Sequence, residues 1–251
     1  MEININCDLG ETSKFCSTEN DPLLLGIVNS ANVACGYHAG DEPTMKKTVE
    51  ISKKNGVSIG AHPSFNDPEN FGRKRLNLSS KEITKLIIDQ IEVLSAIAEK
   101  KSVKVTHVKP HGALGNLAAR DFSVAYEIAK AVKCIDPDLA YLAISGTESE
   151  KAARASGIKV YAEIFADRGY LSTGQLVPRG QEGAMIESTA EAAKRIVYFL
   201  KDGKMPVIDG DPIPLKAQSI CVHGDSRNAV AMAGELKKRL IAEGVEIKSF
   251  I

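Results

Sequence analysis

Short apolar segments recur along the chain, and amphipathic segments with helical spacing lie between them. The apolar segments are rich in β-branched residues and have the length of strands. Alternation of strands with helices predicts a parallel sheet built from βαβ units, and therefore an α/β fold. The expected strands cover residues 3–7, 31–35, 57–61, 105–109, 139–144, 159–164 and 219–222.

Capping residues mark the starts of several expected helices. Ser79 and Glu82 have the spacing of a capping box, and so do Ser188 and Glu191. Each box precedes apolar residues at a period near 3.6, so we expect a helix after each of them. Further helices are expected at residues 41–55, 121–132, 147–156 and 226–243.

No Ser/Gly linker or low-complexity tract divides the chain, so we expect one domain over residues 1–251. Strand–helix alternation alone does not choose between a closed barrel and an open doubly wound sheet. A dinucleotide-binding sheet is disfavoured, because no Gly-x-Gly-x-x-Gly follows the first strand. Asp209-Gly210 lies in a Gly- and Pro-rich stretch and predicts a hairpin, inserted near residues 203–216.

Composition excludes several classes of protein. Hydrophobic residues make up 43% and charged residues 25%, as in an ordinary globular protein. The 32 basic and 32 acidic residues give no net charge, so no overall field favours nucleic acid or an anionic membrane. No apolar run is long enough to span a bilayer, and the first residues do not resemble a signal peptide. We therefore expect a cytoplasmic protein that binds neither nucleic acid nor membrane.

The five cysteines are odd in number and form no Cys-x-x-Cys pair. This pattern argues against a disulfide framework and against a structural zinc site. Three of them, Cys7, Cys35 and Cys221, lie in apolar segments. Free, buried thiols are therefore expected.

Four histidines each follow directly on an expected strand: His38, His62, His111 and His223. Asp8 ends the first strand in the same way. In parallel α/β folds, ligands bind at the carboxyl ends of the strands, where loops gather groups from many strands. One such histidine is typical of a hydrogen-bonded loop residue, but four on four strands favour a common polar pocket.

Alternation along two strands predicts that further polar side chains line the interior of a barrel. The polar face of the first strand carries Asn4, Asn6 and Asp8, and that of the fourth carries His107, Lys109 and His111. Buried polar groups need partners, so this lining is either a satisfied network or a site. We interpret Asn4 and His107 as structural, and Lys109 as functional because a lysine is rarely buried.

Several charged residues admit two interpretations. Asp41 either caps the following helix or belongs to the site. Arg73, in a basic loop, and Arg168 either are solvated or clamp a carboxylate or phosphate. Glu163 and Asp167 lie with Arg168 around the end of the sixth strand.

No nucleophile motif of the Gly-x-Ser-x-Gly type is present, and no Walker-type phosphate loop. If ATP takes part, this chain does not hold it in such a loop. Asp8, His62 and His111 are candidates for a metal site of two histidines and one carboxylate. Nothing in their spacing demands a divalent metal.

Seven motifs, in order, give the chain a resemblance to the LamB/YcsF family over nearly its whole length. They include Asn-Cys-Asp-Leu-Gly-Glu at 6–11, Gly-Ala-His-Pro at 60–63 and Val-Lys-Pro-His-Gly-Ala-Leu at 108–114. The other motifs lie at residues 30–41, 71–73, 163–168 and 221–225.

The resemblance implies a single irregular seven-stranded β/α (TIM-like) barrel, similar to glycoside hydrolase and deacetylase folds. It also implies an ATP-dependent 5-oxoprolinase reaction, which opens 5-oxo-L-proline to L-glutamate. Two partner subunits, B and C, come with that activity, and they are candidates to hold the ATP. Two other functions stay open: a non-catalytic subunit that binds lactam, and a stand-alone metal-dependent amide hydrolase or deacetylase. Assembly into a homo-oligomer also stays open.

The family motifs and the strand ends together give two sets of candidate site residues. We expect Asp8 or His62 to act as general base, and Lys109 and His111 to stabilise charge and donate protons. Arg168 or Arg73 is expected to hold the substrate carboxylate. The candidate substrate-binding residues are Asn32, His38, Asp41, Arg73, Glu163, Asp167, Arg168 and His223.

Two positions depart from the family pattern. Gly115 stands where the family usually has Tyr, which could widen the pocket or alter substrate preference. Lys74 stands where a second Arg often follows Phe-Gly-Arg, and we expect little effect from it.

Overall fold

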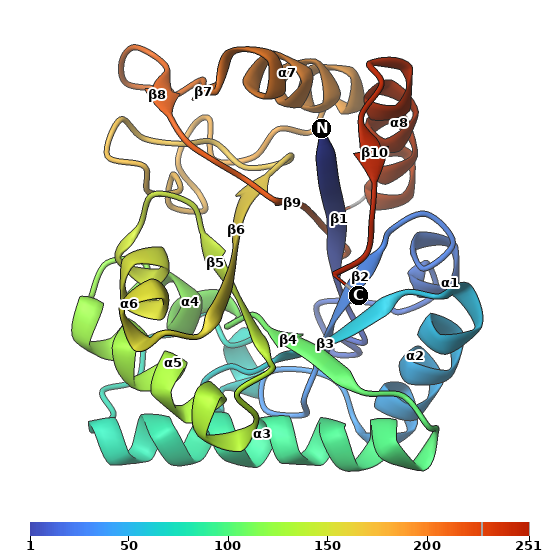
Figure 1. The fold of residues 1–251 in the computed structure, drawn as a ribbon, viewed down its shortest axis with the longest axis vertical. Coiled ribbons are helices and arrows are strands. Elements are labelled where there is room, and N and C mark those ends of the chain that lie inside the picture. Colours follow the sequence, from blue (N-terminus) through green and yellow to red (C-terminus); the bar gives the residue numbers. More distant parts are fainter. Residues whose placement is uncertain (227, 251) are drawn as a thin grey trace.

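Seven parallel strands close into a barrel in the computed structural model, which describes residues 1–226 and 228–250 (Figure 1). The strands are β1 Glu2–Leu9, β2 Ser30–Ala34, β3 Ser58–His62, β4 Val105–Val108, β5 Ala140–Ile144, β6 Lys159–Phe165 and β9 Ser219–His223. Each pairs with the next, and β9 pairs with both β6 and β1. The closed seven-stranded β/α barrel is therefore confirmed, and the open doubly wound sheet is excluded.

Helices surround the barrel (Figure 1). They are α1 Asp21–Leu24, α2 Glu42–Asn55, α3 Ser80–Lys100, α4 Gly112–Ala118, α5 Phe122–Ile135, α6 Glu148–Ser156, α7 Thr189–Asp202 and α8 Ala229–Ala242, with a 3₁₀ turn η1 at Pro68–Asn70. The capping box of Ser79 and Glu82 starts α3, and the Ser188 hydroxyl caps α7. The sequence did not predict α1 and α4, because four and seven residues are too few to show a helical period.

Alternation in β1 sets the two faces of the barrel wall. Ile3, Ile5 and Cys7 are buried in the hydrophobic core. Asn4 and Asn6 are also buried, but their side chains bond to polar groups of other strands inside the barrel. The apolar face therefore packs outward and the polar face lines the interior, as predicted.

Two short pairs of strands lie outside the barrel wall. Between α7 and β9, β7 Lys204–Met205 pairs antiparallel with β8 Ile213–Pro214. After α8, β10 Glu246–Ile247 pairs parallel with the start of β1. The chain then covers the lower end of the barrel, where the strands begin. The Phe250 ring stacks on Tyr161 there, with 4.1 Å between centroids.

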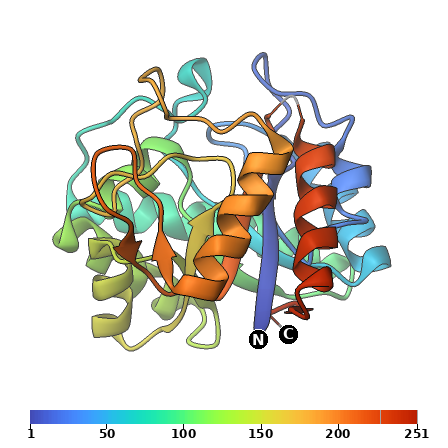
Figure 2. The ribbon, with the colours of Figure 1, turned by 90° about the horizontal axis from the view of Figure 1, so that it is seen from above.

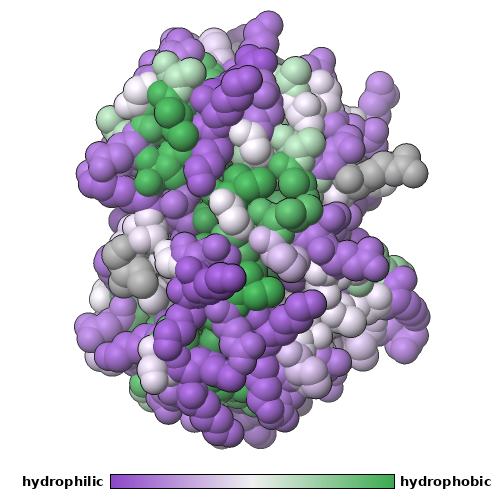
Figure 3. All heavy atoms as spheres, turned by 90° about the vertical axis from the view of Figure 1, so that its right-hand side faces the viewer, coloured by the Kyte–Doolittle hydropathy of each residue, from purple (hydrophilic) through white to green (hydrophobic). Residues whose placement is uncertain are grey.

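Figure 2 shows β1 running away from the side of the molecule where both termini lie. The loop after β1 and the long loop before α7 lie on the opposite side. The side with α8, α1 and α2 is mainly hydrophilic, with a smaller hydrophobic area in its middle (Figure 3). Amphipathic helices that bury one face against a barrel leave such a surface.

All five cysteines are free, and Cys7, Cys35 and Cys221 are buried, as predicted. Within the described residues, no helix has the length and apolar character needed to cross a membrane.

Candidate active site at the carboxyl ends of the barrel strands

A pocket of about 420 Å³ opens where the barrel strands end. Its lining includes many of the candidate residues from the sequence, and they come from several different strands. They are Asp8, His62, Arg73, Lys109, His111, Glu163, Arg168 and His223. Convergence of the strand ends on one pocket is therefore observed.

A network of neutral groups fills the barrel interior below the pocket. The Asn32 amide nitrogen donates to Asn6 Oδ1 and to Asp8 Oδ1, both at 2.8 Å. Asn32 Oδ1 accepts from His107 Nε2 at 2.9 Å. Burial lowers the pKa of His107 to about 3, so this ring is neutral. Asn32 and His107 thus support Asp8 from below and do not line the pocket.

Lys109 is the central cation of the site. Its Nζ lies 2.9 Å from Asp8 Oδ1, 3.3 Å from Glu163 Oε2 and 3.0 Å from Cys221 Sγ. Burial opposes charge on this amine, but Asp8, Cys221 and Glu163 outweigh burial and raise its pKa. The neighbouring Asp8 carboxylate in particular keeps Lys109 charged at a position where a lone lysine would lose its proton.

The two carboxyl groups beside Lys109 differ. Burial raises the pKa of Asp8, but His62 and Lys109 together outweigh it and hold the pKa well below its usual value. For Glu163, burial dominates and raises the pKa to about 7. One group is therefore a carboxylate, and the other titrates near neutral pH.

His62 and His111 form a pair at the floor of the pocket. His62 Nδ1 lies 2.6 Å from the Lys109 carbonyl oxygen, and His111 Nε2 lies 3.0 Å from the Phe71 carbonyl oxygen. The other two nitrogens, His62 Nε2 and His111 Nδ1, face each other at 3.0 Å.

Glu11 belongs to this cluster, although the sequence did not single it out. Its Oε1 lies 3.1 Å from His38 Nε2 and 3.2 Å from His111 Nδ1. Burial raises the pKa of Glu11, and the nearby Asp8 charge adds to this. The family motif at residues 6–11 ends on Glu11, and that was the available signal.

His38 packs behind the histidine pair and does not line the pocket. Its ring stacks on His111 with 3.9 Å between centroids. Its Nε2 faces Glu11, whereas its buried Nδ1 has no hydrogen-bond partner among the residues the structure describes. Burial lowers the pKa of His38, so it is a neutral group that positions Glu11 and His111.

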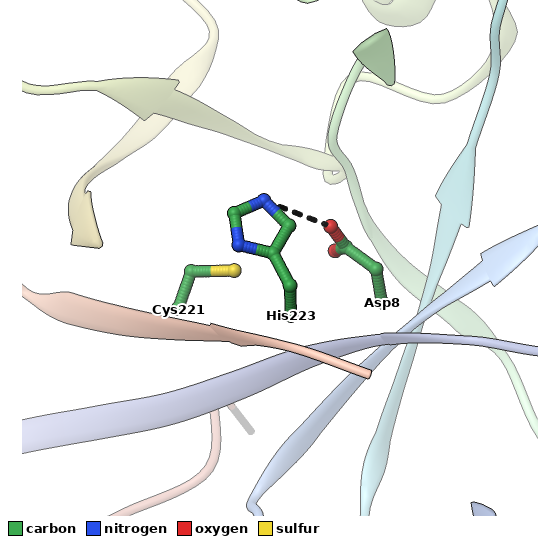
Figure 4. Close-up of side chains that lie close together, drawn as sticks. All are labelled: Asp8, Cys221 and His223. Carbon is green, nitrogen blue, oxygen red and sulfur yellow. Dashed lines mark ion pairs between the residues drawn. The ribbon is translucent and has the colours of Figure 1, made fainter. Parts of the chain in front are cut away.

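His223 and Asp167 form a dyad on the opposite wall. His223 Nδ1 lies 2.9 Å from both carboxylate oxygens of Asp167. Burial works against charge on Asp167, but the His223 ring and its hydrogen bonds lower the pKa overall. His223 Nε2 points to Asp8 Oδ2 at 4.0 Å, and Cys221 points into the same space (Figure 4). The imidazole is therefore oriented by a carboxylate and open to the pocket on its other nitrogen.

Arg168 is a buried guanidinium without a hydrogen-bonded carboxylate among the described residues. Its Nε donates to the Ala184 carbonyl at 3.1 Å, and its Nη2 donates to the Val177 carbonyl at 2.7 Å. Burial lowers its pKa to about 10, and the Arg179 charge adds to this. It lines the pocket, so an anionic ligand can supply the missing counter-charge.

The basic loop reaches the histidines through Phe71, Gly72 and Arg73. Phe71 adopts φ 56°, which costs a non-glycine residue about 1–3 kcal/mol. This conformation aims its carbonyl at His111. A Cβ on Gly72 would lie 2.2 Å from Ser64 Oγ, so only glycine fits. Arg73 pairs with Asp225 at 2.5 Å at the rim.

Asp41 lies outside the pocket. Its Oδ1 accepts from the Thr44 backbone nitrogen at 2.8 Å, and its side chain is exposed. Of the two interpretations of Asp41, the helix cap is observed, and the side chain is not part of the pocket lining.

Three groups of side chains offer metal-ligand atoms within 4.8 Å of one another. One is the predicted set of Asp8, His62 and His111. The second combines Glu11 and His38 with His111. The third combines Asp8 with the pair Cys221 and His223.

Comparison with known sequences places the whole chain in one family. Residues 3–251 match the sequence profile of LamB/YcsF. The chain belongs to the LamB/YcsF family. A relative in Staphylococcus carnosus, named as the A subunit of 5-oxoprolinase, is 43% identical over 247 residues, which cover 98% of each chain.

Solved structures agree with this membership. The LamB/YcsF chain matches the lactam utilization protein of Thermus thermophilus with a TM-score of 0.92 and 38% identity, over 100% of both chains. It also matches the catalytic domain of a peptidoglycan N-acetylglucosamine deacetylase of Eubacterium rectale, with a TM-score of 0.53 and 10% identity. That likeness covers 100% of this chain and 88% of the other, and it shows a shared fold.

The two departures from the family pattern lie at different places. Gly115 lines the pocket, and a Cβ there would lie 2.6 Å from the Pro110 carbonyl oxygen. Lys74 is exposed and is not part of the pocket lining.

Proposed function

We propose that this chain is the lactam-opening subunit of an ATP-dependent 5-oxoprolinase, which converts 5-oxo-L-proline to L-glutamate. The observation that carries the proposal is one pocket that brings together Lys109, the His223–Asp167 dyad and Arg168. These groups supply a fixed positive charge, a proton acceptor and an anion site. The similarity to relatives named as the A subunit of 5-oxoprolinase supports the same reaction.

Arg168 is the proposed partner of the substrate carboxylate. Its two bonds to backbone carbonyls fix the plane of the guanidinium and leave other N–H groups for a ligand. Arg73 is less suited to this role, because Asp225 already holds it. Further arginines of the pocket lining, Arg75, Arg120 and Arg179, make the rim attractive for a second anionic group.

His223 is the proposed general base. The sequence suggested Asp8 or His62 for this role, but Asp8 already accepts from Lys109 and Asn32, and His62 Nε2 faces His111. His223 has its Nδ1 fixed by Asp167, which leaves Nε2 as the proton acceptor. Its side chain is 13% exposed, so water and substrate can reach it.

Lys109 is the proposed stabiliser of negative charge on the reacting oxygen. It is charged, buried and part of the pocket lining, and a fixed charge acts strongly where water is excluded. His111 was expected to donate protons beside it. Its Nε2 proton is already given to the Phe71 carbonyl, so Lys109 carries this role in our proposal.

The chemistry needs an activated lactam, because amide resonance protects the carbonyl carbon. Transfer of phosphate from ATP to the lactam oxygen activates that carbon. Water then adds to it, and its proton passes to His223 Nε2. The proton held by His223 then passes to the ring nitrogen as the C–N bond breaks, and a second water hydrolyses the remaining acyl phosphate to glutamate and phosphate. Protonation of nitrogen decides that the C–N bond breaks instead of the bond to phosphate.

Partner subunits B and C are the proposed site of ATP binding. This chain has no Walker-type loop, and its pocket is lined by groups suited to a small anion. The lactam would reach this pocket in its activated form. The five free thiols support a reducing, cytoplasmic setting for the reaction.

A reconstitution assay tests this proposal. The chain is mixed with 5-oxo-L-proline and ATP, alone and with subunits B and C, and glutamate and ADP are measured. We expect glutamate only in the full mixture. His223→Gln should lower kcat by about 10²–10⁴-fold, the usual size of a general-base effect. Arg168→Lys should mainly raise KM, because a lysine loses the planar fork.

Asp121→Asn is the matched control, because Asp121 is a half-buried helix cap of α5 whose side chain is not part of the pocket lining. It should leave both kcat and KM within twofold of wild type. Glutamate made by this chain alone without ATP would instead establish the stand-alone amide hydrolase. If His223→Gln and Lys109→Met weaken lactam binding but leave kcat intact, the chain is a non-catalytic lactam-binding subunit.

A further inference from the structure

Backbone carbonyls fix the tautomers of His62 and His111. A carbonyl oxygen only accepts, so His62 Nδ1 carries the proton given to Lys109, and His111 Nε2 carries the proton given to Phe71. In neutral rings, the remaining nitrogens then have no proton. Those nitrogens, His62 Nε2 and His111 Nδ1, face each other at 3.0 Å. Two lone pairs at this distance repel each other unless a cation lies between them.

The tautomers match the pattern of metal-binding histidines. Such histidines almost always donate the second ring N–H to a carboxylate, a backbone carbonyl or water, which fixes the ring. Both rings of this pair do so, and in one case the strained backbone of Phe71 aims the carbonyl. The structure thus holds two rings rigidly with their lone pairs turned to one point.

A carboxylate oxygen also lies beside each of these two nitrogens. Asp8 Oδ2 lies 3.4 Å from His62 Nε2. Glu11 Oε1 lies 3.2 Å from His111 Nδ1 and 3.9 Å from His62 Nε2. A tetrahedral ion with bonds of about 2.0–2.2 Å holds its ligand atoms about 3.3–3.6 Å apart. The four separations, from 3.0 to 3.9 Å, fall around that value.

The charges of the cluster also call for a cation. Asp8 and Glu163 share Lys109. Glu11 is 3% exposed, and among residues 1–226 and 228–250 its ion-pair partners are histidines only. A buried carboxylate without a lysine or arginine is costly unless it binds a metal. A divalent ion between the rings would stabilise Glu11 in its ionised form.

We propose that Asp8, Glu11, His62 and His111 form a binding site for one divalent transition-metal ion of the zinc type. Two imidazoles with two carboxylates favour zinc over calcium or magnesium, which prefer oxygen ligands alone. His38 is a positioning residue, since its Nε2 holds the Glu11 oxygen that binds the ion. A bound ion with four protein ligands would tie these side chains together at the floor of the pocket.

The site lies within the pocket of the proposed lactam-opening reaction, so a role in that reaction rests on the proposed function. Metal binding itself does not, because it is measured without substrate, ATP or partner subunits. The competing arrangement is a single proton shared between the two rings. It satisfies the same lone pairs, but it predicts no metal.

Metal content and titration test the proposal directly. The purified full-length chain is stripped with a chelator, reloaded with zinc chloride, dialysed and assayed for zinc. We expect one zinc ion per chain. Cobalt chloride serves as a second probe, because the visible absorption of Co²⁺ becomes intense in four-coordinate sites. A Co²⁺ spectrum of the wild-type chain needs no variant, so it does not depend on how a variant folds.

Two variants change one carboxyl group each to an amide of the same shape. Glu11→Gln should weaken zinc binding at least 100-fold. Glu163→Gln removes a buried carboxyl of the same pocket that is not in the ligand set, and it should leave zinc binding within threefold of wild type. His111→Asn should also abolish the cobalt spectrum.

Several results would overturn the proposal: no zinc retained by the wild-type chain, or zinc binding that Glu11→Gln and His111→Asn leave unchanged. A cobalt spectrum of six-coordinate type would also contradict the four-ligand site. If zinc binds as expected but no glutamate forms with subunits B and C, the metal site stands and the proposed reaction fails. If instead glutamate forms with a chain that binds no zinc, the metal site fails and the proposed reaction stands.

Discussion

The interior of the barrel has two halves with different chemistry. In the lower half, near the starts of the strands, neutral groups such as Asn4, Ser30 and Ser219 bond to one another at 2.9 Å. In the upper half, near the carboxyl ends of the strands, Lys109 meets two carboxyl groups, and two histidine ring nitrogens face each other. Both halves are buried and polar, and they come from the same strands. Burial and polarity alone therefore do not distinguish structure from function.

What separates the halves is whether the groups satisfy one another. In the lower half, Asn4, Asn6, Asn32, His107 and Ser219 bond to other neutral side chains of the interior, so the network rigidifies the barrel and offers little to a ligand. In the upper half, Arg168 lacks a hydrogen-bonded carboxylate within the described chain, and Glu11 has histidines as its ion-pair partners. A substrate or an ion can complete an arginine without a carboxylate and a cluster of facing ring nitrogens and carboxyl oxygens.

The largest expected effect is on chemistry in the upper half. Lys109→Met should lower kcat in the three-subunit assay by about 10³-fold or more, because the fixed charge at the reacting oxygen is lost. Asp8 and Glu163 would then be buried without their cation, so stability should fall as well. Activity per folded molecule, measured after gel filtration, separates the two effects. A kcat within tenfold of wild type would contradict the assigned role.

In the lower half, the largest expected effect is on stability. A Cβ on Gly60 would lie 2.2 Å from His107 Nε2, so Gly60→Ala should destabilise the fold by about 3 kcal/mol through overpacking. Gly234→Ala is the matched control, since a Cβ there meets nothing within 4 Å. It should be neutral or stabilising in urea denaturation, as is usual for alanine in a helix. Equal effects of the two substitutions would show that the lower network is not tightly packed.

A smaller effect follows from the titration of Glu163, which lies where the two halves meet. Burial raises its pKa to about 7, above the value of a free glutamate, so the folded state favours the protonated carboxyl. Its contribution to stability is therefore full at low pH and is lost as the pH rises through about 7. Denaturation at pH 5 and pH 8 should show a loss of about 1–3 kcal/mol in the wild type.

Glu163→Gln cannot ionise, so its stability should change less over the same range of pH. The comparison between the two proteins removes the contribution of every other titrating group. Parallel curves for wild type and variant would mean that Lys109 keeps Glu163 ionised, and that the upper half carries one more negative charge.

The sequence predicted the wall of the barrel well, because each strand has a clear apolar segment and the capping boxes mark the helices. It also placed His62, Lys109 and His111 at one pocket, since consecutive parallel strands end on the same side. It missed Glu11, which follows a glycine turn after β1 and has no periodic signal. It left Asp41 open, because a cap and a ligand look alike before the backbone is known.

The smallest expected effect concerns Asp41, which the structure places outside both halves. Asp41→Ala removes the bond to the Thr44 backbone nitrogen and should destabilise α2 by about 1 kcal/mol, the usual loss for a helix cap. Asp121→Ala, which removes the two bonds that cap α5, should cost a similar amount. Neither should change kcat or KM in the three-subunit assay. A tenfold fall in kcat/KM for Asp41→Ala alone would place this carboxylate in the reaction after all, and the upper half would then extend to the loop before α2.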